Sequence, residues 1–452
     1  MRLATRLVDG RPPGPRGAPL IGNTLQFALA PLEFPRQCLA DYGEIVYLEV
    51  RGLKTFLVVD PDAIETVLVT NHGNFILDRL SKGLSDALGN SLLVSDGGHW
   101  ERQRRLVQPA FHKSRIESYA ATMIRFAEQQ IADWESGQVV DIFQEMSQVM
   151  LNIVASTLIG YDVTGRRAVI DHYLKTAMRY VLGIAGTGLR LPLRFPTPAN
   201  LACVRAGEKL DDVIFDLIRE RRRHDSDNGD LLSMLLLARD EDGQPMSEQD
   251  IRDEIVTMIL VGHETSALAL TFSFWLLANH PAAFQKLGAE IDEVLGGRTV
   301  TAGDLSRLRY GDWVLNEVLR LYPPVWAMGR EAIETCAVGG YVFPAGSQIL
   351  LSPWVSHRNP NYFDDPDQFS PERWATADKL PRYAYFPFGG GPRLCLGNRY
   401  ARMEALVILA TIAQRFTFSA VPGQQLDLLP TITLRPRHRL KLTVEARPKN
   451  GI

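Results

Sequence analysis

The chain has 452 residues, of which 46% are hydrophobic and 22% are charged, and its net charge is −3. This ordinary globular composition can bury a large core, and the charge gives no general attraction to nucleic acid or to an anionic membrane. The four cysteines are too few and too scattered for a disulfide framework, and they fit a reducing compartment. We therefore expect a cytoplasmic protein that binds no nucleic acid.

The first part of the chain predicts a stiff lead-in followed by short strands. Residues 11–22 are rich in proline and glycine, which excludes a helix, and the N-terminus shows neither a signal peptide nor a membrane span. Strands are expected at residues 45–50 and 55–59, and the pair Asp60 and Pro61 can begin a helix. These segments indicate a small β element near the N-terminus.

Most of the remaining chain predicts helices, because apolar residues recur every three or four positions. The longest helix is expected from about Ser247 to Asn279, and polar residues interrupt its apolar run, which is typical of a buried core helix. Strand patterns return at residues 338–352 and in the C-terminal tail. No repeat or linker divides the chain, so we expect one mainly α domain with small β-sheets over residues 1–452, with residues 1–22 as its lead-in.

Cys395 lies on a glycine-rich loop that leads into a helix. Residues 389–392 read Gly-Gly-Gly-Pro, which excludes regular structure and lets the backbone approach a flat partner closely, and an amphipathic pattern follows Gly397. Free backbone N–H groups and the helix dipole at such a junction stabilise negative charge, which lowers the pKa of a thiol. A nucleophile or redox centre would want a nearby histidine or a second cysteine, and this segment has neither. The loop therefore favours an axial thiolate ligand for iron.

The segment resembles the cysteine signature of the cytochrome P450 family, F-x-x-G-x-R-x-C-x-G. Phe388, Gly391, Arg393, Cys395 and Gly397 occupy its five fixed positions. The resemblance implies the cytochrome P450 fold, which is mainly α with small β-sheets. In that fold a haem lies between a long distal helix and the helix after the cysteine loop, and Cys395 is the ligand of its iron.

A second family motif is the E-x-x-R pair, matched by Glu317 and Arg320 in NEVLRLYPP. Opposite charges at i and i+3 on a helix can form an ordinary surface salt bridge, which is worth under about 1 kcal/mol. The resemblance implies instead a buried pair that is joined by Arg373 of PERW (371–374). The three residues would then hold the segment that leads to the cysteine loop.

The long helix carries VGHETS (261–266), which resembles the oxygen-activation motif of the family. A glutamate inside an apolar helix is costly unless it is solvated, paired or protonated. The resemblance assigns Thr265 to positioning water for proton delivery to O2, and Glu264 to relaying protons from solvent. A hydrogen bond from Thr265 to its own helix backbone is the alternative. Val261 stands where the family usually has Ala or Gly, which narrows the expected oxygen groove.

The remaining site residues are expected to bind the haem propionates. Trp100 and Arg104 match the family's W-x-x-x-R helix, and their i, i+4 spacing places them on one face. Arg330 and Arg393 occupy two further propionate-binding positions of the family. Three arginines for two carboxylates is a sensible balance of charge.

The resemblance implies a haem-thiolate monooxygenase with haem b as cofactor, which inserts one atom of O2 into an apolar substrate. Electrons from NAD(P)H would come through a partner, because no flavin or ferredoxin segment is visible in the sequence. The expected proximal face is basic, which favours an acidic ferredoxin or flavodoxin with its reductase, although ordinary solvated charge is the alternative. The basic residues of this face are Arg102, Arg105, Lys113, Arg115, Arg399 and Arg402. We also expect the protein to be a monomer.

The expected pocket walls are rich in apolar residues, which indicates hydroxylation or epoxidation of a fatty acid, a terpene or a polyketide-like compound. They are residues 75–95, 181–200, 325–328 and 431–434. Two other functions stay open. A peroxide-using haem-thiolate enzyme should lack the acid–alcohol pair, and a non-catalytic haem sensor or electron carrier should need no roomy apolar pocket.

Overall fold

The computed structural model describes residues 10–158, 160, 169–170, 172–173, 176–177, 180, 193, 195–224 and 228–447. The chain forms two compact units, and each combines segments that are far apart in the sequence. The first unit comprises Met1–Gly83, Leu319–Cys395 and Ile432–Leu434, and the second comprises Leu84–Val318, Leu396–Thr431 and Arg435–Ile452. The expected loop at 183–200 lies largely outside the described residues.

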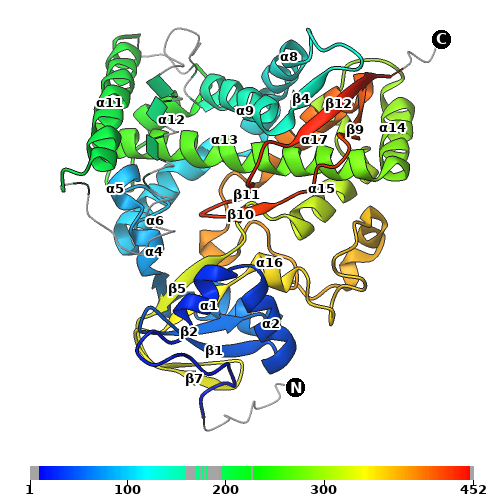
Figure 1. Ribbon diagram of the computed structural model, residues 1–452. Coiled ribbons are helices and arrows are strands. Elements are labelled where there is room, and N and C mark those ends of the chain that lie inside the picture. Colours follow the sequence, from blue (N-terminus) through cyan, green and yellow to red (C-terminus); the bar gives the residue numbers. More distant parts are fainter. Residues whose placement is uncertain are drawn as a thin grey trace. The chain divides into compact units, whose positions relative to one another are not determined.

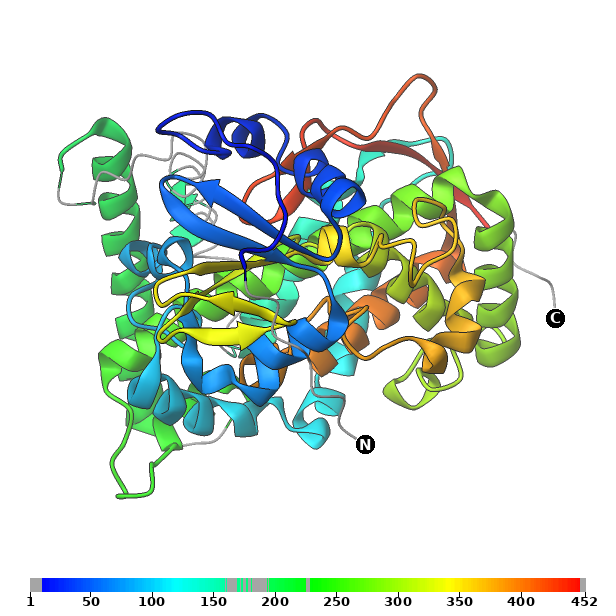
Figure 2. The ribbon, with the colours of Figure 1, turned by 90° about the horizontal axis from the view of Figure 1, so that it is seen from below.

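A five-stranded sheet in the order β1-β2-β8-β5-β3 organises the first unit. The N-terminal strands, blue in Figures 1 and 2, lie beside yellow strands from the later segment. The hairpin of β1 and β2 is antiparallel, with Ile45 opposite Val58, whereas β2 and β8 run parallel, with Thr55 opposite Gln348. The five strands are β1 (Ile45–Val50), β2 (Leu53–Val58), β3 (Phe75–Leu77), β5 (Met328–Ala332) and β8 (Gln348–Leu351).

Short helices surround this sheet, and the expected helix start at Asp60 is confirmed. Asp60 caps α3 (Pro61–Glu65) by accepting a hydrogen bond of 2.7 Å from the amide of Ala63, and Pro61 occupies the first turn, where its missing N–H costs nothing. The chain continues into a π-helical turn, η1 (Thr66–Thr70). The other elements of this unit are α1 (Thr24–Leu29), α2 (Glu33–Tyr42), η2 (His72–Asn74), α4 (Arg79–Lys82), β6 (Cys336–Val338), β7 (Tyr341–Phe343), α16 (Pro353–Ser356), η6 (Pro371–Lys379) and η7 (Gly391–Arg393).

The lead-in contains no helix in residues 10–22, as predicted. It lies along the first strand, because the amide of Tyr47 donates a hydrogen bond of 2.9 Å to the carbonyl of Pro13. This contact gives the proline-rich segment a fixed place beside the sheet of the first unit.

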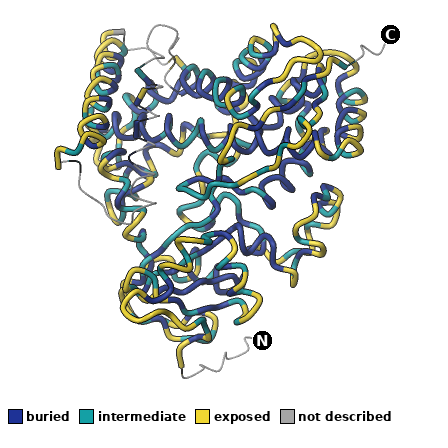
Figure 3. The backbone as a smooth tube through the Cα atoms, viewed as in Figure 1, coloured by how far each residue is buried: buried dark blue, intermediate teal, exposed yellow. Residues whose placement is uncertain are grey.

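The second unit is built around α13 (Glu248–Asn279), the long green helix of Figure 1. Ser247 caps it by accepting a hydrogen bond of 3.0 Å from the amide of Asp250, and Pro281 begins the next helix, so both ends agree with the prediction. The helix is long and apolar enough to cross a membrane, but 67% of its most apolar 18-residue window is buried inside the protein. Figure 3 shows it mostly dark blue, as in a core helix.

Helices α9 and α17 pack against α13, and the remaining helices cover this core. The described helices of the second unit include α5 (Ser85–Leu88), α6 (Gly97–Val107), η3 (Gln108–Phe111), α7 (Lys113–Ser118), α8 (Ala120–Gln130), α9 (Ile142–Leu158), α11 (Pro198–His224), α12 (Leu231–Leu237), α14 (Pro281–Leu295), η5 (Ala302–Asp304) and α17 (Asn398–Arg415). Helix α15 (Arg309–Leu321) begins in the second unit and ends in the first.

The bounds of α17 match the predicted helix after Gly397, but its amphipathic character does not. Every residue from 403 to 413 is buried. The reason is that α8, α13 and α14 all pack on this helix, which leaves no solvent-facing stripe over these turns.

The predicted C-terminal strands are also present. In the second unit, β12 (Lys441–Ala446) is the central strand of a three-stranded antiparallel sheet between β4 (Val139–Asp141) and β9 (Phe416–Ala420). Leu442 lies opposite Val140 and Ala420. The short strands β10 (Leu428–Pro430) and β11 (Leu434–Pro436) precede it in the chain.

Candidate active site

The cysteine loop of the first unit ends at the predicted junction with a helix. Cys395 is exposed, follows the short helical turn η7, and lies three residues before the start of α17. Its amide donates a hydrogen bond of 3.0 Å to the carbonyl of Phe388, which closes the loop on itself. Phe388 and Cys395, two residues of the family signature, are thus joined through their backbones.

Two positions of this loop require glycine because the loop backbone packs closely against other residues of the first unit. Gly391 has φ +65°, and a side chain there would meet the backbone carbonyl of Leu68 in η1. A Cβ atom at Gly390 would lie 2.5 Å from the ring of Tyr383. The sequence suggested close approach to a flat partner, whereas at these two positions the close neighbours are η1 and a tyrosine of the first unit.

The four cysteines differ in their availability as thiolates. Burial raises the pKa of Cys38 to about 12, and burial also raises the pKa values of Cys203 and Cys336. Cys395 is the exposed one, and none of the four forms a disulfide. A haem iron needs one accessible sulfur on a well-held loop, so Cys395 fits this cofactor and the other three do not.

The segment before the loop is held by Arg320, which is fully buried at 0% exposure. Its guanidinium donates to the carbonyls of His357 (3.0 Å), Pro366 (2.6 Å) and Gln368 (3.0 Å). Arg373 donates to the carbonyl of Asp364 at 2.9 Å and also reaches that of Gln368 at 3.4 Å. Both arginines thus hold the backbone of this segment, and Glu317 is buried on α15 as expected, while its pairing with Arg320 and Arg373 stays a prediction.

His357 is a positioning residue that the sequence did not indicate. Its buried ring accepts a hydrogen bond of 2.9 Å at Nε2 from the amide of Phe386, two residues before Phe388. Burial, followed by the nearby charges of Arg320 and Arg358, holds its pKa well below the usual range. The ring is therefore neutral, and only a neutral ring can accept this bond. A lone histidine at the end of a short helix carries no sequence signal for such a role.

The four residues expected at the propionates are divided between the two units. Arg330 on β5 is 9% exposed and Arg393 ends η7, both in the first unit. Trp100 and Arg104 lie half-buried one turn apart on α6 in the second unit. Each pair carries side chains of the predicted chemistry, and their contact with a haem stays a prediction.

Thr265, on α13 in the second unit, donates its hydroxyl hydrogen to the carbonyl of Val261 at 2.8 Å. This is the backbone bond that the sequence left as the alternative. The bond occupies the hydroxyl hydrogen but leaves the lone pairs of Oγ1, so in this geometry Thr265 can accept a hydrogen bond from water. The hydrogen bond to the helix backbone and the positioning of a water molecule are thus both compatible with the same position of the Thr265 side chain.

Glu264, beside it, is paired with Arg435, which the sequence did not predict. The side chains form an ion pair and are only 8% and 18% exposed, respectively. Burial lowers the pKa of Arg435, as expected for a cation removed from water. The pair explains how α13 tolerates a buried glutamate. In the sequence, Arg435 lies in ITLRP, some 170 positions after Glu264, and nothing local indicates that the two residues pair.

Acidic partners balance much of the basic face expected for a redox protein. Four of its six cations form ion pairs within the second unit, with exposures from about one quarter to three quarters. Arg399 is exposed. Long-range attraction of an acidic partner is correspondingly weaker than the count of basic residues suggested. The pairs are Arg102–Asp240, Arg105–Glu241, Lys113–Glu117 and Arg402–Asp312.

Comparisons with known proteins agree with the family resemblance seen in the sequence. A family model described as Cytochrome P450 matches residues 12–444. The chain is 37% identical over 437 residues to cyclooctatin synthase of Streptomyces melanosporofaciens, covering 95% of this chain and 93% of that protein. It is 33% identical over 449 residues to pentalenene oxygenase of Streptomyces avermitilis, covering 97% and 98%.

The solved structure titled retinoic acid bound cyanobacterial CYP120A1 is similar, with a TM-score of 0.85 and 28% identity. The match covers 96% of this chain and 99% of that chain. This likeness confirms the predicted fold class, mainly α with small β-sheets.

Proposed function

The chain belongs to the cytochrome P450 family, and from that premise we propose a neutral, terpene-like compound as the substrate of its monooxygenase reaction. The family's cofactor is haem b, its co-substrate is O2, and its electrons derive from NAD(P)H through a redox partner. When bound, the haem supplies the activation of O2, and the protein supplies binding, orientation and proton transfer. One oxygen atom enters an apolar substrate.

The ion pair between Glu264 and Arg435 carries the proposal of a neutral substrate. A substrate must bring the carbon to be oxidised to the motif that holds Glu264 and Thr265. Arg435 is the cation bound at that motif, and Glu264 already balances its charge. A carboxylate placed there would face a glutamate and an arginine whose charge Glu264 already balances, so burying it would be costly.

The names of the two Streptomyces relatives support the same class. Cyclooctatin synthase and pentalenene oxygenase are named for cyclic terpenes, whose carbon skeletons carry no charge at neutral pH. The described parts of the expected pocket walls, residues 75–95, 325–328 and 431–434, are rich in apolar residues. A fatty acid fits this combination less well than a terpene does.

A pair of matched ligands tests the substrate class. We expect a cyclic terpene alcohol to bind at least about tenfold more tightly than the carboxylic acid of the same skeleton, because only the acid buries an unpaired charge. Glu264→Gln frees Arg435, and the acid should then gain about tenfold in affinity while the alcohol changes little. Dissociation constants come from titration of the haem spin state.

The double variant Glu264→Gln with Arg435→Gln is the control, and it should lose the gain for the acid. If the wild-type protein binds the acid as tightly as the alcohol, the substrate is not selected by charge and the proposal is wrong. If Glu264→Gln weakens both ligands equally, the ion pair serves the fold rather than selectivity.

We propose the following roles for the site residues. Cys395 binds the iron, on a loop closed by the backbone of Phe388, and Thr265 accepts a hydrogen bond from the water that delivers protons. Glu264 passes protons from solvent, for which it must exchange its bond to Arg435. The propionates would be held by Trp100, Arg104, Arg330 and Arg393.

Thr265→Ala tests the proton-delivery role. We expect oxygen consumption to persist at a comparable rate, product to fall by about tenfold and peroxide to rise, because the water loses its acceptor. The measurement is the ratio of product to NAD(P)H consumed. Thr265→Ser restores the hydroxyl and should restore most of this ratio, and an unchanged ratio in Thr265→Ala removes the residue from the mechanism.

We propose a ferredoxin or flavodoxin, with its reductase, as the electron donor of a monomeric cytoplasmic protein. The basic residues of α6, α7 and α17 support a docking face, and their ion pairs make its attraction modest. The rate of reduction by such a donor should therefore fall with salt by only a few-fold. A rate that does not change with salt argues against docking by charge.

A further inference from the structure

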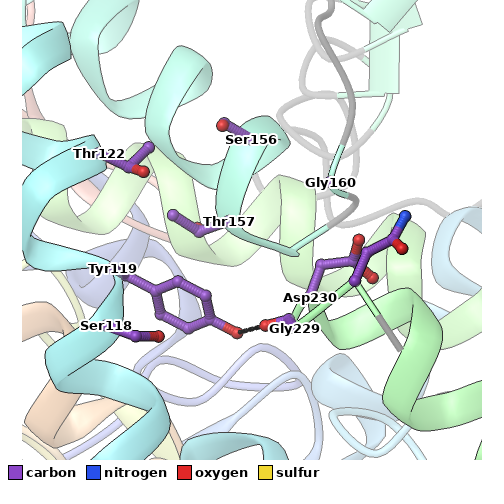
Figure 4. A pocket seen from close by; sticks show the side chains of 9 residues that line it. Ser118, Tyr119, Thr122, Ser156, Thr157, Gly160, Gly229 and Asp230 are labelled. Carbon is purple, nitrogen blue, oxygen red and sulfur yellow. Dashed lines mark hydrogen bonds between the residues drawn. The ribbon is translucent and has the colours of Figure 1, made fainter. Parts of the chain in front are cut away.

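A solvent-open polar pocket lies in the second unit, beside α9. It has a volume of about 270 Å³. Figure 4 shows hydroxyl groups from two helical segments converging on it, and Tyr119 donating across it to the carbonyl of Gly229 at 2.8 Å. Its rim is exposed at Ser118, Gly160 and Asn228, and its floor is buried at Thr157. The lining residues are Ser118, Tyr119, Thr122, Ser156, Thr157, Gly160, Asn228, Gly229 and Asp230.

The chemistry of the lining fits water. Asp230 contributes a carboxylate, but this group is bound by Arg221 at 2.5 Å and by the amide of Ser233 at 2.8 Å. The other lining side chains offer neutral hydroxyl and amide groups. The pocket is large enough for several water molecules.

The floor of the pocket continues into the protein as a chain of hydroxyl groups. Thr157 donates its hydroxyl to the carbonyl of Ile153 at 2.8 Å, and its Oγ1 lies 2.8 Å from the Oη of Tyr400 on α17. Because the hydroxyl hydrogen of Thr157 is already used, Tyr400 is the donor in the second bond. The buried phenol thus points its hydrogen toward the pocket.

Glu404 lies one turn beyond Tyr400 on α17 and is 0% exposed. Among the described residues, neither oxygen of its carboxyl group has a hydrogen bond of ordinary geometry. Burial raises its pKa to about 8, while the hydroxyls of Ser266 and Tyr400 lie close enough to lower it in part. The protonated form is therefore favoured at neutral pH, and any titration of this buried group requires a route for its proton.

We propose that this pocket is a proton entrance, joined through the hydroxyls of Thr157 and Tyr400 to the buried carboxyl group of Glu404. For release, the carboxyl proton passes to Tyr400 Oη, the phenolic proton passes to Thr157 Oγ1, and the Thr157 proton passes to a pocket water. A carboxylate remains and hydronium leaves, so atoms and charge balance, and uptake is the reverse. Thr157 must first turn its hydroxyl away from Ile153.

The groups that act on Glu404 belong to three helical segments. Ser266 acts from α13 and Tyr400 from α17 itself, and Tyr119 acts in turn on Tyr400. The carboxyl group lies about 9 Å along α17 from its first residue, Asn398. A carboxylate there adds negative charge to the helix that begins after Cys395, which would lower the reduction potential of an iron bound at that cysteine. This last consequence rests on the proposed iron ligand, whereas the proton route does not.

Infrared spectroscopy of the holoenzyme tests the route. The C=O band of a protonated carboxyl group that disappears in Glu404→Gln at pH 7 belongs to Glu404, and its shift after transfer to D2O reports proton exchange. We expect Thr157→Val, which keeps the volume and removes the hydroxyl, to slow this exchange by about tenfold or more, since the residue lies within hydrogen-bond reach of the pocket water. Tyr400→Phe should slow it similarly.

Two control variants separate the route from general opening of the fold. Thr122→Val changes the same pocket away from the chain of hydroxyls and should leave the exchange rate unchanged, and Thr157→Ser should restore it. An exchange rate equal to wild type in both Thr157→Val and Tyr400→Phe would show that local opening supplies the protons. If Glu404→Gln removes no band at pH 7, the carboxyl group is ionised and the proposal is wrong. Neither result depends on the identity of the iron ligand.

Discussion

Replacing Cys395 by serine is expected to abolish the reduced-CO absorption band that is typical of the family, and to reduce substrate oxidation by about a thousandfold or more. A serine hydroxyl on the same loop keeps the hydrogen bond from the amide of residue 395 to Phe388, so the loop itself should survive. What is lost is a sulfur that donates electron density to the iron. The measurements are the absorption spectrum of the reduced CO complex and the rate of product formation.

Cys336→Ser is the matched control for this experiment. Cys336 is half-buried in the same unit, and burial raises the pKa of its thiol, so it is a poor thiolate. Its variant should keep the absorption band and the rate. If Cys395→Ser keeps the band while Cys336→Ser loses it, the assignment of the ligand is wrong.

Arg320→Leu is expected to lower the free energy of unfolding by about 3–5 kcal/mol, because it removes a buried, hydrogen-bonded charge. The carbonyls of His357 and Pro366 would each lose the arginine donor, and that of Gln368 would keep only its longer bond from Arg373. The same carbonyls lie on the segment that positions the cysteine loop, so we also expect much of the purified protein to lack haem. Urea denaturation and the ratio of haem to protein measure the two effects.

Arg373→Leu supplies the comparison, since this arginine binds the same segment from a half-exposed position. Its loss should cost only about 1–2 kcal/mol, because water can replace its longer bonds of 3.4 Å to Asp365 and Gln368. Equal losses in the two variants would mean that burial of Arg320 adds nothing. A stable Arg320→Leu variant with full haem content would overturn the scaffold role.

Local pattern predicted those parts of the molecule that depend on neighbouring residues. The strand at Ile45–Val50, the cap at Asp60, the start of α13 after Ser247 and the junction at Cys395 all follow from turn chemistry, capping and spacing over a few positions. The cysteine signature belongs to this class too, because its glycines and its thiol occupy one short loop. For the same reason the order of the motifs sufficed to identify the family.

The sequence by itself thus determined the family, the elements and the residues at which chemistry is expected, while partners remote in the chain were decided only by the tertiary structure. Glu264 needed a partner, but only the folded chain brings Arg435 to it. The burial of residues 403–413 of α17, the bond from Phe386 to His357 and the contact between Thr157 and Tyr400 likewise depend on packing between distant segments. The physical reason is that capping and periodicity act over one or two turns, whereas desolvation and charge pairing depend on which segments the fold places side by side.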